Sequence, residues 1–193
     1  MTRWDDVAEW GPLRRWGLIL LVLVLTAVVL LAMGRDPICP CGHVRIWGGT
    51  TGPENSQHLA DWYAPSHVLH GFLFYLLFWL VAPKLSFECR LLGAIVLEAA
   101  WEITENTSWL IERYKGITVS LHYNGDSVIN SMADIGFMML GFWLAARLPV
   151  WAVVLIAVAS EAVTAIVIRD GLLLTVVMLL WPVEAILNWQ TGG

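Results

Sequence analysis

The sequence predicts an all-α protein, an integral membrane bundle of six transmembrane helices with a long outer loop after the first helix. Its 193 residues are 58% hydrophobic and 14% charged, and the mean hydropathy is +0.68, which is too apolar for an ordinary soluble domain. Six apolar runs are each long enough to cross a bilayer at about 1.5 Å per residue, and the 12 Trp residues suit membrane interfaces. We therefore expect residues 1–193 to form one membrane domain. The predicted helices are Trp16–Met33, Pro65–Ala82, Leu91–Ile111, Ser127–Ala146, Val150–Ile168 and Leu172–Trp189.

The first run follows Arg14 and Arg15, as the core of a signal peptide would. No small-x-small cleavage site comes after it, so we interpret the run as a retained anchor. Residues 34–64 then form a polar loop rich in Gly and Pro. Pro65 suits the first position of the next helix, and further Pro and Gly residues mark the connections between the later helices.

The Lys and Arg residues of the short loops are divided almost evenly between the two sides, so the doublet Arg14 and Arg15 decides the orientation. The doublet predicts a multi-pass protein of the bacterial inner (plasma) membrane with both termini in the cytoplasm. The long loop and residues 112–126 then face the periplasm, where thiols can be oxidised.

Three of the predicted helices carry polar side chains at helical spacing, and in this topology all three stripes lie at the outer end. Residues three or four apart fall on one face of a helix. An acid near the bilayer centre costs on the order of 3 kcal/mol, and such groups usually face a bundle interior or a wet cavity and mark a functional site. The stripes contain His67 and His70; Glu98, Glu102 and Glu105; and Asp126, Asn130 and Asp134.

Two imidazoles among several carboxylates form a ligand set for a divalent metal ion, with zinc as the first candidate and iron or manganese as alternatives. A cation would also offset the repulsion among the acids, which would otherwise take up protons. A hydrogen-bond network that shares protons between helices is the other interpretation. The predicted metal ligands are His67, His70, Glu102, Glu105, Asp126 and Asp134, and the predicted catalytic residues are Glu102, as general base, with Glu98 and Asn130.

The outer loop carries a second polar group, which we expect to fold back as a lid or substrate-binding segment. Cys39, Cys41 and His43 could bind copper or zinc or be redox-active, but no second cysteine pair completes a tetrahedral site. We therefore place the cysteines outside the main chemistry. A Ser, His and Asp triad within this short loop is disfavoured, because residues so close in sequence rarely adopt that geometry. The predicted lid residues are Glu54, Asn55, His58 and Asp61.

These features favour a metal-dependent membrane hydrolase that acts on a lipid or lipid-linked substrate at the outer leaflet. A di-iron-type oxidoreductase would use the same ligand types. A proton- or cation-coupled carrier is a further alternative, with Glu161 and Glu184 supplying the inner half of its path, and a non-catalytic assembly or sensor protein is another. The net charge of −5 and the lack of a basic cluster argue against nucleic-acid binding, and the oligomeric state is left open.

Four segments, ENSQHLADWYAPSHVLHG, WEITENT, YNGDSVINSMAD and RLPVW, together resemble a family of uncharacterised bacterial multi-pass inner-membrane proteins of the domain-of-unknown-function class. The resemblance covers nearly the whole chain. More distantly, the order of the histidines, glutamates and aspartates is similar to small VanZ-like membrane proteins. The resemblance implies a membrane location and brings no known reaction to these positions.

Overall fold

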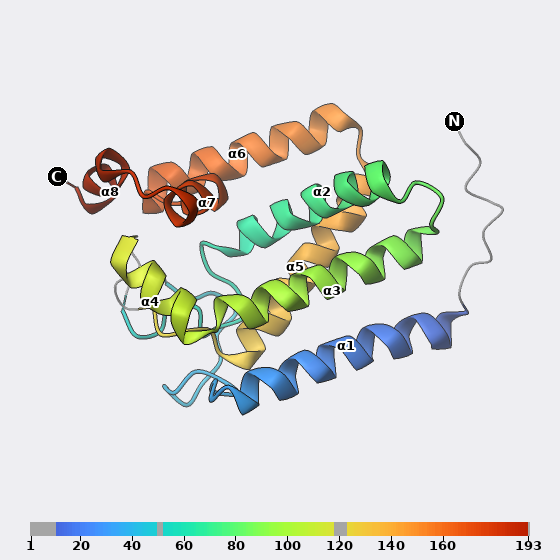
Figure 1. The fold of residues 1–193 in the computed structure, drawn as a ribbon, viewed down its shortest axis with the longest axis horizontal. Helices are drawn as coiled ribbons and strands as arrows, with labels where there is room; N and C mark the ends of the chain where they lie inside the picture. Colours follow the sequence, from blue (N-terminus) through green and yellow to red (C-terminus); the bar gives the residue numbers. More distant parts are fainter. Residues whose placement is uncertain (1–10, 50–51, 118–122, 193) are drawn as a thin grey trace.

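The computed structural model describes residues 11–49, 52–117 and 123–192, and in these residues it contains eight helices and no strands. The predicted all-α class is confirmed. Figure 1 shows the long helices packed into one bundle, with the shorter helices gathered at one end. The helices are α1 (Pro12–Ala32), α2 (Ala64–Val81), α3 (Phe87–Glu105), α4 (Ser108–Ile117), α5 (Val128–Arg147), α6 (Val150–Ile168), α7 (Leu172–Leu180) and α8 (Glu184–Thr191).

The helix pair α2 and α5 forms the centre of the bundle, with α3 packed against both and α1 packed against α3. The pair approaches closely at Gly71 and Gly141, where a Cβ atom on either residue would collide with the backbone of the other helix. Small residues allow such close helix contacts in membranes. Behind this contact, Ile95, Ile135 and Phe142 are completely buried and form part of the apolar core.

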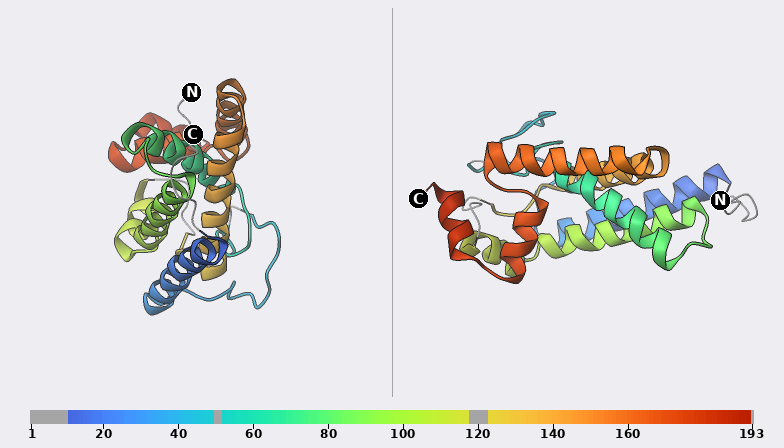
Figure 2. Two further views of the ribbon diagram at one scale, coloured as in Figure 1. Left: turned by 90° about the vertical axis from the view of Figure 1, so that its right-hand side faces the viewer. Right: turned by 90° about the horizontal axis from the view of Figure 1, so that it is seen from above.

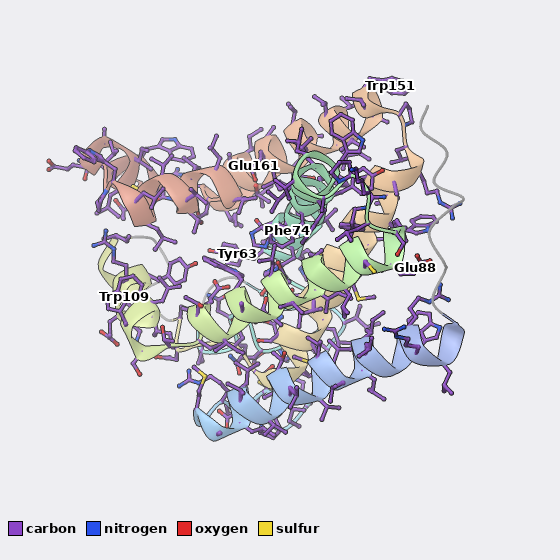
Figure 3. All side chains as sticks on the ribbon, turned by 45° about the vertical axis from the view of Figure 1, so that its right-hand side comes forward. Tyr63, Phe74, Glu88, Trp109, Trp151 and Glu161 are labelled. Carbon is purple, nitrogen blue, oxygen red and sulfur yellow. A yellow bond between two sulfur atoms is a disulfide. The ribbon has the colours of Figure 1, made fainter. Side chains whose placement is uncertain are left out.

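Four helices, α1, α2, α5 and α6, are long and apolar enough to cross a membrane. α3 has 19 residues and lies alongside them, but it carries the acidic stripe. Exposed aromatic residues mark both ends of the bundle: Figure 3 shows Trp109 on α4 and Trp151 at the start of α6 at opposite ends. This placement is typical of the two interfaces of a membrane protein.

Two of the six predicted helices are each divided in the structure. The predicted helix Leu91–Ile111 ends at Glu105, because the Asn106 side chain folds back to donate to the carbonyl oxygen of Glu102 at 3.0 Å, and α4 follows after one turn. The predicted helix Leu172–Trp189 is interrupted at residues 181–183. Pro182 lacks a backbone N–H and forces the residue before it into an extended conformation, so the helix cannot continue.

The long loop and the three short helices gather at one end of the bundle, which we call the polar end because the predicted polar site lies there. Residues 34–49 and 52–63, α4, α7 and α8 all lie there, where α3 finishes and α2 and α5 begin (Figures 1 and 2). Because α7 and α8 remain at the polar end, no sixth helix returns across the bundle within the described residues. The start of α1 and the end of α8 therefore lie at opposite ends, whereas the sequence predicted that they share one side.

The outer loop is joined to the start of α5 by backbone hydrogen bonds. The amides of Ser127, Val128 and Ile129 would lack partners within the helix, and they donate to loop carbonyl oxygens at 3.1, 2.8 and 3.2 Å. The accepting residues are Ser56, Asp36 and Pro37. This docking fixes the loop over the same helix end that carries the predicted site.

Candidate functional site

The two histidines of α2 both face Glu98 of α3. The Nδ1 atom of His67 lies 2.7 Å from Glu98 Oε1, and the Nδ1 atom of His70 lies 3.0 Å from each carboxylate oxygen. When a carboxylate accepts the Nδ1 proton, Nε2 is left as the atom that can bind a metal ion or a proton. The sequence predicted Glu98 as a catalytic residue, but its contacts are those of a residue that orients both imidazoles.

Glu102, one turn further along α3, has no such partners. Its side chain is completely buried, and neither carboxylate oxygen accepts a hydrogen bond. The nearest basic group is His67, whose Nδ1 atom lies 3.5 Å from Oε1 and already contacts Glu98. A buried carboxylate that lacks donors is costly unless a cation or a proton compensates it. The proton-sharing network, which was the other interpretation of these residues, also stays a prediction.

Glu102 belongs to two groups of potential ligands that meet at its carboxylate. In each group, one donor atom of every residue lies within 4.8 Å of the others. The first group also contains His67 and Asp134, whose Nε2 and Oδ2 atoms are 3.7 Å apart. The second contains Glu105, at the end of α3, and Asp126, just before α5. The structure thus brings five of the six predicted ligands together directly, and the sixth, His70, adjoins them through Glu98.

Asp126 is held from two sides by residues that the sequence interpretation did not assign to the site. Its Oδ2 atom accepts from Asn106 Nδ2 at 2.7 Å and from the Tyr123 hydroxyl at 3.1 Å. Burial raises the pKa of Asp126 to about 6, against the lowering effect of these two hydrogen bonds. The Asn106 amide at the end of α3 is typical of a helix terminus and was the available signal. Tyr123 offered no such signal, because its contact with Asp126 belongs to no helical pattern in the sequence.

A cavity of about 60 Å³ opens beside these groups, which is room for a small number of water molecules. His70, Glu105 and Asp134 line it from the helices, and none of its described lining residues is Lys or Arg. Tyr114 of α4 also lines it, and burial together with the Glu105 carboxylate raises the pKa of its hydroxyl. Thr175 of α7 completes the opposite wall. The cavity is therefore acidic, and the short helices α4 and α7 contribute to its lining.

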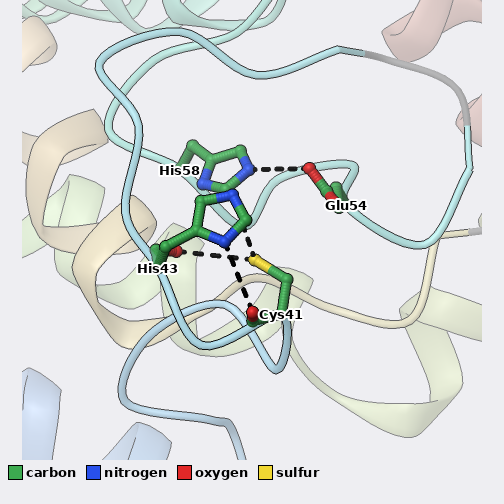
Figure 4. A group of neighbouring side chains, drawn as sticks. All are labelled: Cys41, His43, Glu54 and His58. Carbon is green, nitrogen blue, oxygen red and sulfur yellow. Dashed lines mark hydrogen bonds and ion pairs between the residues drawn. The ribbon is translucent and has the colours of Figure 1, made fainter.

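The four predicted lid residues divide between two places. Asn55 and Asp61 line the cavity, and burial raises the pKa of the Asp61 carboxyl, although the Tyr63 amide donates to it at 2.7 Å. Glu54 and His58 do not line the cavity. They lie instead in a second cluster on the outer loop, which Figure 4 shows.

In this second cluster, defined by Cys41, His43, Glu54 and His58, the potential ligands are already engaged. The Nε2 atom of His58 lies 3.1 Å from Glu54, and its Nδ1 atom accepts from the Arg45 amide at 3.3 Å. Cys41 forms a disulfide with Cys39. The hydrogen bond from His58 lowers the pKa of Glu54. The polar atoms of this cluster therefore contact one another within the loop. Cys41 lies in this cluster, with Cys39 bonded to it, and neither cysteine is among the residues around Glu102.

Asn130, predicted as catalytic, contacts the loop in the structure. Its Nδ2 atom donates to the carbonyl oxygen of His58 at 2.7 Å, and its backbone amide donates to Ser127 Oγ at 3.3 Å. The disfavoured triad does not form, since Ser56 contacts Asp61 at 3.3 Å while His58 faces Glu54.

Glu161 and Glu184, the two acids that the carrier alternative would use, lie outside the site. Both carboxylate oxygens of Glu161, labelled in Figure 3, accept backbone amides at the start of α7, from Leu172 at 3.0 Å and Leu173 at 2.9 Å. Next to it, Asp170 accepts the Tyr63 hydroxyl at 3.2 Å. These contacts hold α7 beside the cavity. Glu184, at the start of α8, is exposed.

Comparison with known proteins places this arrangement in a family. The family model "Protein of unknown function (DUF2585)" matches residues 30–192. The chain belongs to this family. Relatives named "UPF0314 protein" include one from Paracoccus denitrificans that is 60% identical over 89% of the chain and 90% of its own length. A relative from Agrobacterium fabrum is 52% identical over 93% of the chain and 91% of its own length. A relative from Novosphingobium aromaticivorans is 47% identical over 95% of the chain and 93% of its own length. No solved structure matches the chain, and the more distant similarity to VanZ-like proteins stays a prediction.

Proposed function

We propose that this protein is a membrane-embedded, metal-dependent hydrolase that acts on a lipid or lipid-linked substrate at the outer leaflet. One observation carries the proposal: Glu102 is completely buried among further carboxylates, and neither of its oxygens accepts a hydrogen bond. A cation at this point compensates the charge and gives the carboxylates a common function.

In the proposed orientation, α3 crosses the membrane together with the four apolar helices, so the chain crosses five times. Arg14 and Arg15 favour a cytoplasmic start of α1, because cytoplasmic segments are enriched in Lys and Arg. The polar end then lies outside, together with α7 and α8. The disulfide between Cys39 and Cys41 supports this side, because disulfides persist in oxidising compartments. A phosphatase reporter fused after α8 is expected to be active outside the cell membrane, and an inactive fusion would reverse the orientation.

The short helices beside the cavity suit an amphiphilic substrate. α4 exposes Trp109, and α7 and the turn after it expose Leu173, Leu180 and Trp181. Arg113 of α4 joins the two helices by donating to the carbonyl oxygen of Leu179 at 2.9 Å. Apolar side chains around an acidic cavity let a lipid tail remain in the bilayer while its polar group reaches the site.

The proposed reaction is hydrolysis of an ester, and a bound ion would supply an acidified water molecule at pH 7. His70 is better placed than Glu102 to remove the proton, because Glu98 holds its Nδ1 atom and its ring lines the cavity. The water oxygen bonds to the electrophilic atom of the ester as the bond to the leaving oxygen breaks. The proton taken by His70 then passes to that leaving oxygen.

The test is metal analysis of detergent-purified protein, followed by incubation with bacterial polar lipid extract and mass spectrometry of the products. We expect a bound divalent ion and chelator-sensitive release of a lipid fragment. Replacing His70 by Gln should remove the release and leave the ion, whereas Glu184→Gln should affect neither. Full metal content without any chelator-sensitive product would contradict a hydrolase. The carrier alternative has less support, because Glu161 is occupied in capping α7.

A further inference from the structure

We infer that the site holds two adjacent divalent ions of the manganese class, bridged by the carboxylate of Glu102. This inference rests on the proposed metal dependence and adds the number, position and type of the ions.

The geometry provides two half-sites that share one residue. His67 and Asp134 form one group with Glu102, and Glu105 and Asp126 form another with it, with donor atoms within 4.8 Å of one another in each group. A carboxylate has two oxygens and can bind one ion with each. Ions held in this way lie about 3.5–4 Å apart and act as a pair on an ester undergoing displacement.

The charge of the site also points to two ions. Glu102, Glu105, Asp126 and Asp134 carry four negative charges when ionised, and the described residues that line the adjoining cavity include no Lys or Arg. A single divalent ion would leave two of these charges without compensation in a region of low dielectric constant. A second ion neutralises the set.

The remaining ligand atoms are already oriented for this task. The Oδ2 atom of Asp126 accepts from both Asn106 and Tyr123, which leaves Oδ1 for an ion. Glu98 holds the Nδ1 atom of His67, which leaves Nε2 facing Asp134 at 3.7 Å. Such supporting hydrogen bonds fix the position of metal ligands and strengthen binding.

The donor types identify the class of ion. The two groups that share Glu102 offer one imidazole, from His67, and four carboxylates. Carboxylates and water suit manganese and magnesium, whereas zinc sites are richer in His or Cys. Manganese therefore fits these residues better than the zinc expected from the sequence.

The test is an electron paramagnetic resonance titration of the full chain in detergent micelles. Protein freed of metal by a chelator is titrated with Mn²⁺, and bound ions are counted from the loss of the six-line signal of free Mn²⁺. We expect two ions per chain and a spectrum that shows magnetic coupling between them. Asp134→Asn and Asp126→Asn should each bind one uncoupled ion, Glu102→Gln should bind neither, and Glu184→Gln should bind two.

Each other outcome has a defined meaning. One uncoupled ion in the wild-type protein, with unchanged binding in Asp126→Asn, would overturn the pair and leave the proposed hydrolase standing. Two coupled ions in Glu102→Gln would overturn the bridge. No Mn²⁺ binding by the wild-type protein would overturn the pair and the proposed metal dependence together. Because the coupled spectrum is read from the wild-type protein, the result does not depend on any variant folding.

Discussion

The buried cluster around Glu102 and the loop cluster around His58 contain similar residue types but differ in how their polar atoms are occupied. In the loop cluster, both nitrogens of His58 have partners and Cys41 is in a disulfide. In the buried cluster, Glu102 is completely buried and neither of its oxygens accepts a hydrogen bond. Spacing alone would accept both clusters as metal sites.

The difference shows what a polar cluster needs in order to act. A group whose donors and acceptors are matched gains nothing from a ligand that must first break those contacts. A buried carboxylate without donors gains the full compensation of its charge. The loop cluster therefore stabilises the fold, and the helix cluster is the candidate for chemistry.

The largest expected effect is a difference in metal content between two variants, one with a substitution in each cluster. Glu102→Gln keeps the size of the side chain but removes its charge, so bound metal should fall below a tenth of an equivalent. His58→Gln should keep the full metal content, because its ring binds only loop atoms. Elemental analysis of both purified variants provides the measurement, with melting curves as the control for folding. Metal loss in His58→Gln alone would reverse the comparison.

Glu98→Gln should have the next largest effect. The amide can still contact His67 and His70 but no longer fixes both Nδ1 protons, so Mn²⁺ binding should weaken about 10–100-fold. Equilibrium titration of the purified variant measures this change. Unaltered affinity would show that Glu98 does not orient the ligands.

Asn130→Ala should separate loop anchoring from ion binding. The change leaves the buried carbonyl oxygen of His58 without its donor, which should cost about 1–3 kcal/mol of stability. The bound ions should remain, since Asn130 does not line the cavity. Thermal unfolding and metal content are measured on the same preparation. Loss of metal without loss of stability would instead restore Asn130 to the site.

The sequence predicted the convergence of polar residues because the helical spacing places them on one face of each helix. The alternating direction of successive helices then brings these faces to the same end of the bundle. His67, Glu102 and Asp134 each lie on a stripe near the same end of its helix, and the structure brings them together. The spacing could not separate Glu98 from Glu102, since both fall on one face and only their partners differ. Asn130 also lies on one of the polar stripes, and its assignment to the site stays a prediction.

The ends of the helices were harder to predict than their centres. We predicted residues 172–189 as one helix because the whole segment is apolar. Pro182 was the local signal that this helix is interrupted. Asp126 was counted with the helical stripe, yet α5 begins only at Val128, so the position of the carboxylate depends on Asn106 and Tyr123. Such contacts between distant segments leave no periodic pattern in a sequence.

The smallest expected effect concerns Glu54 of the loop cluster, whose contribution to stability should depend on pH. The hydrogen bond from His58 lowers the pKa of Glu54 below its ordinary value of 4.5, and Arg45 also contacts the carboxylate at 3.0 Å. Because the folded protein favours the ionised form, this contact stabilises the fold above pH 4.5, and its contribution is lost as the pH falls through the folded-state pKa. Glu54→Gln should therefore melt at a slightly lower temperature than the wild-type protein at pH 7, and the difference should vanish under acidic conditions. Melting curves of both proteins across this pH range measure the effect, with metal content as the control. A difference that grows on acidification would mean that the unfolded chain, and not the folded loop, favours the ionised carboxylate.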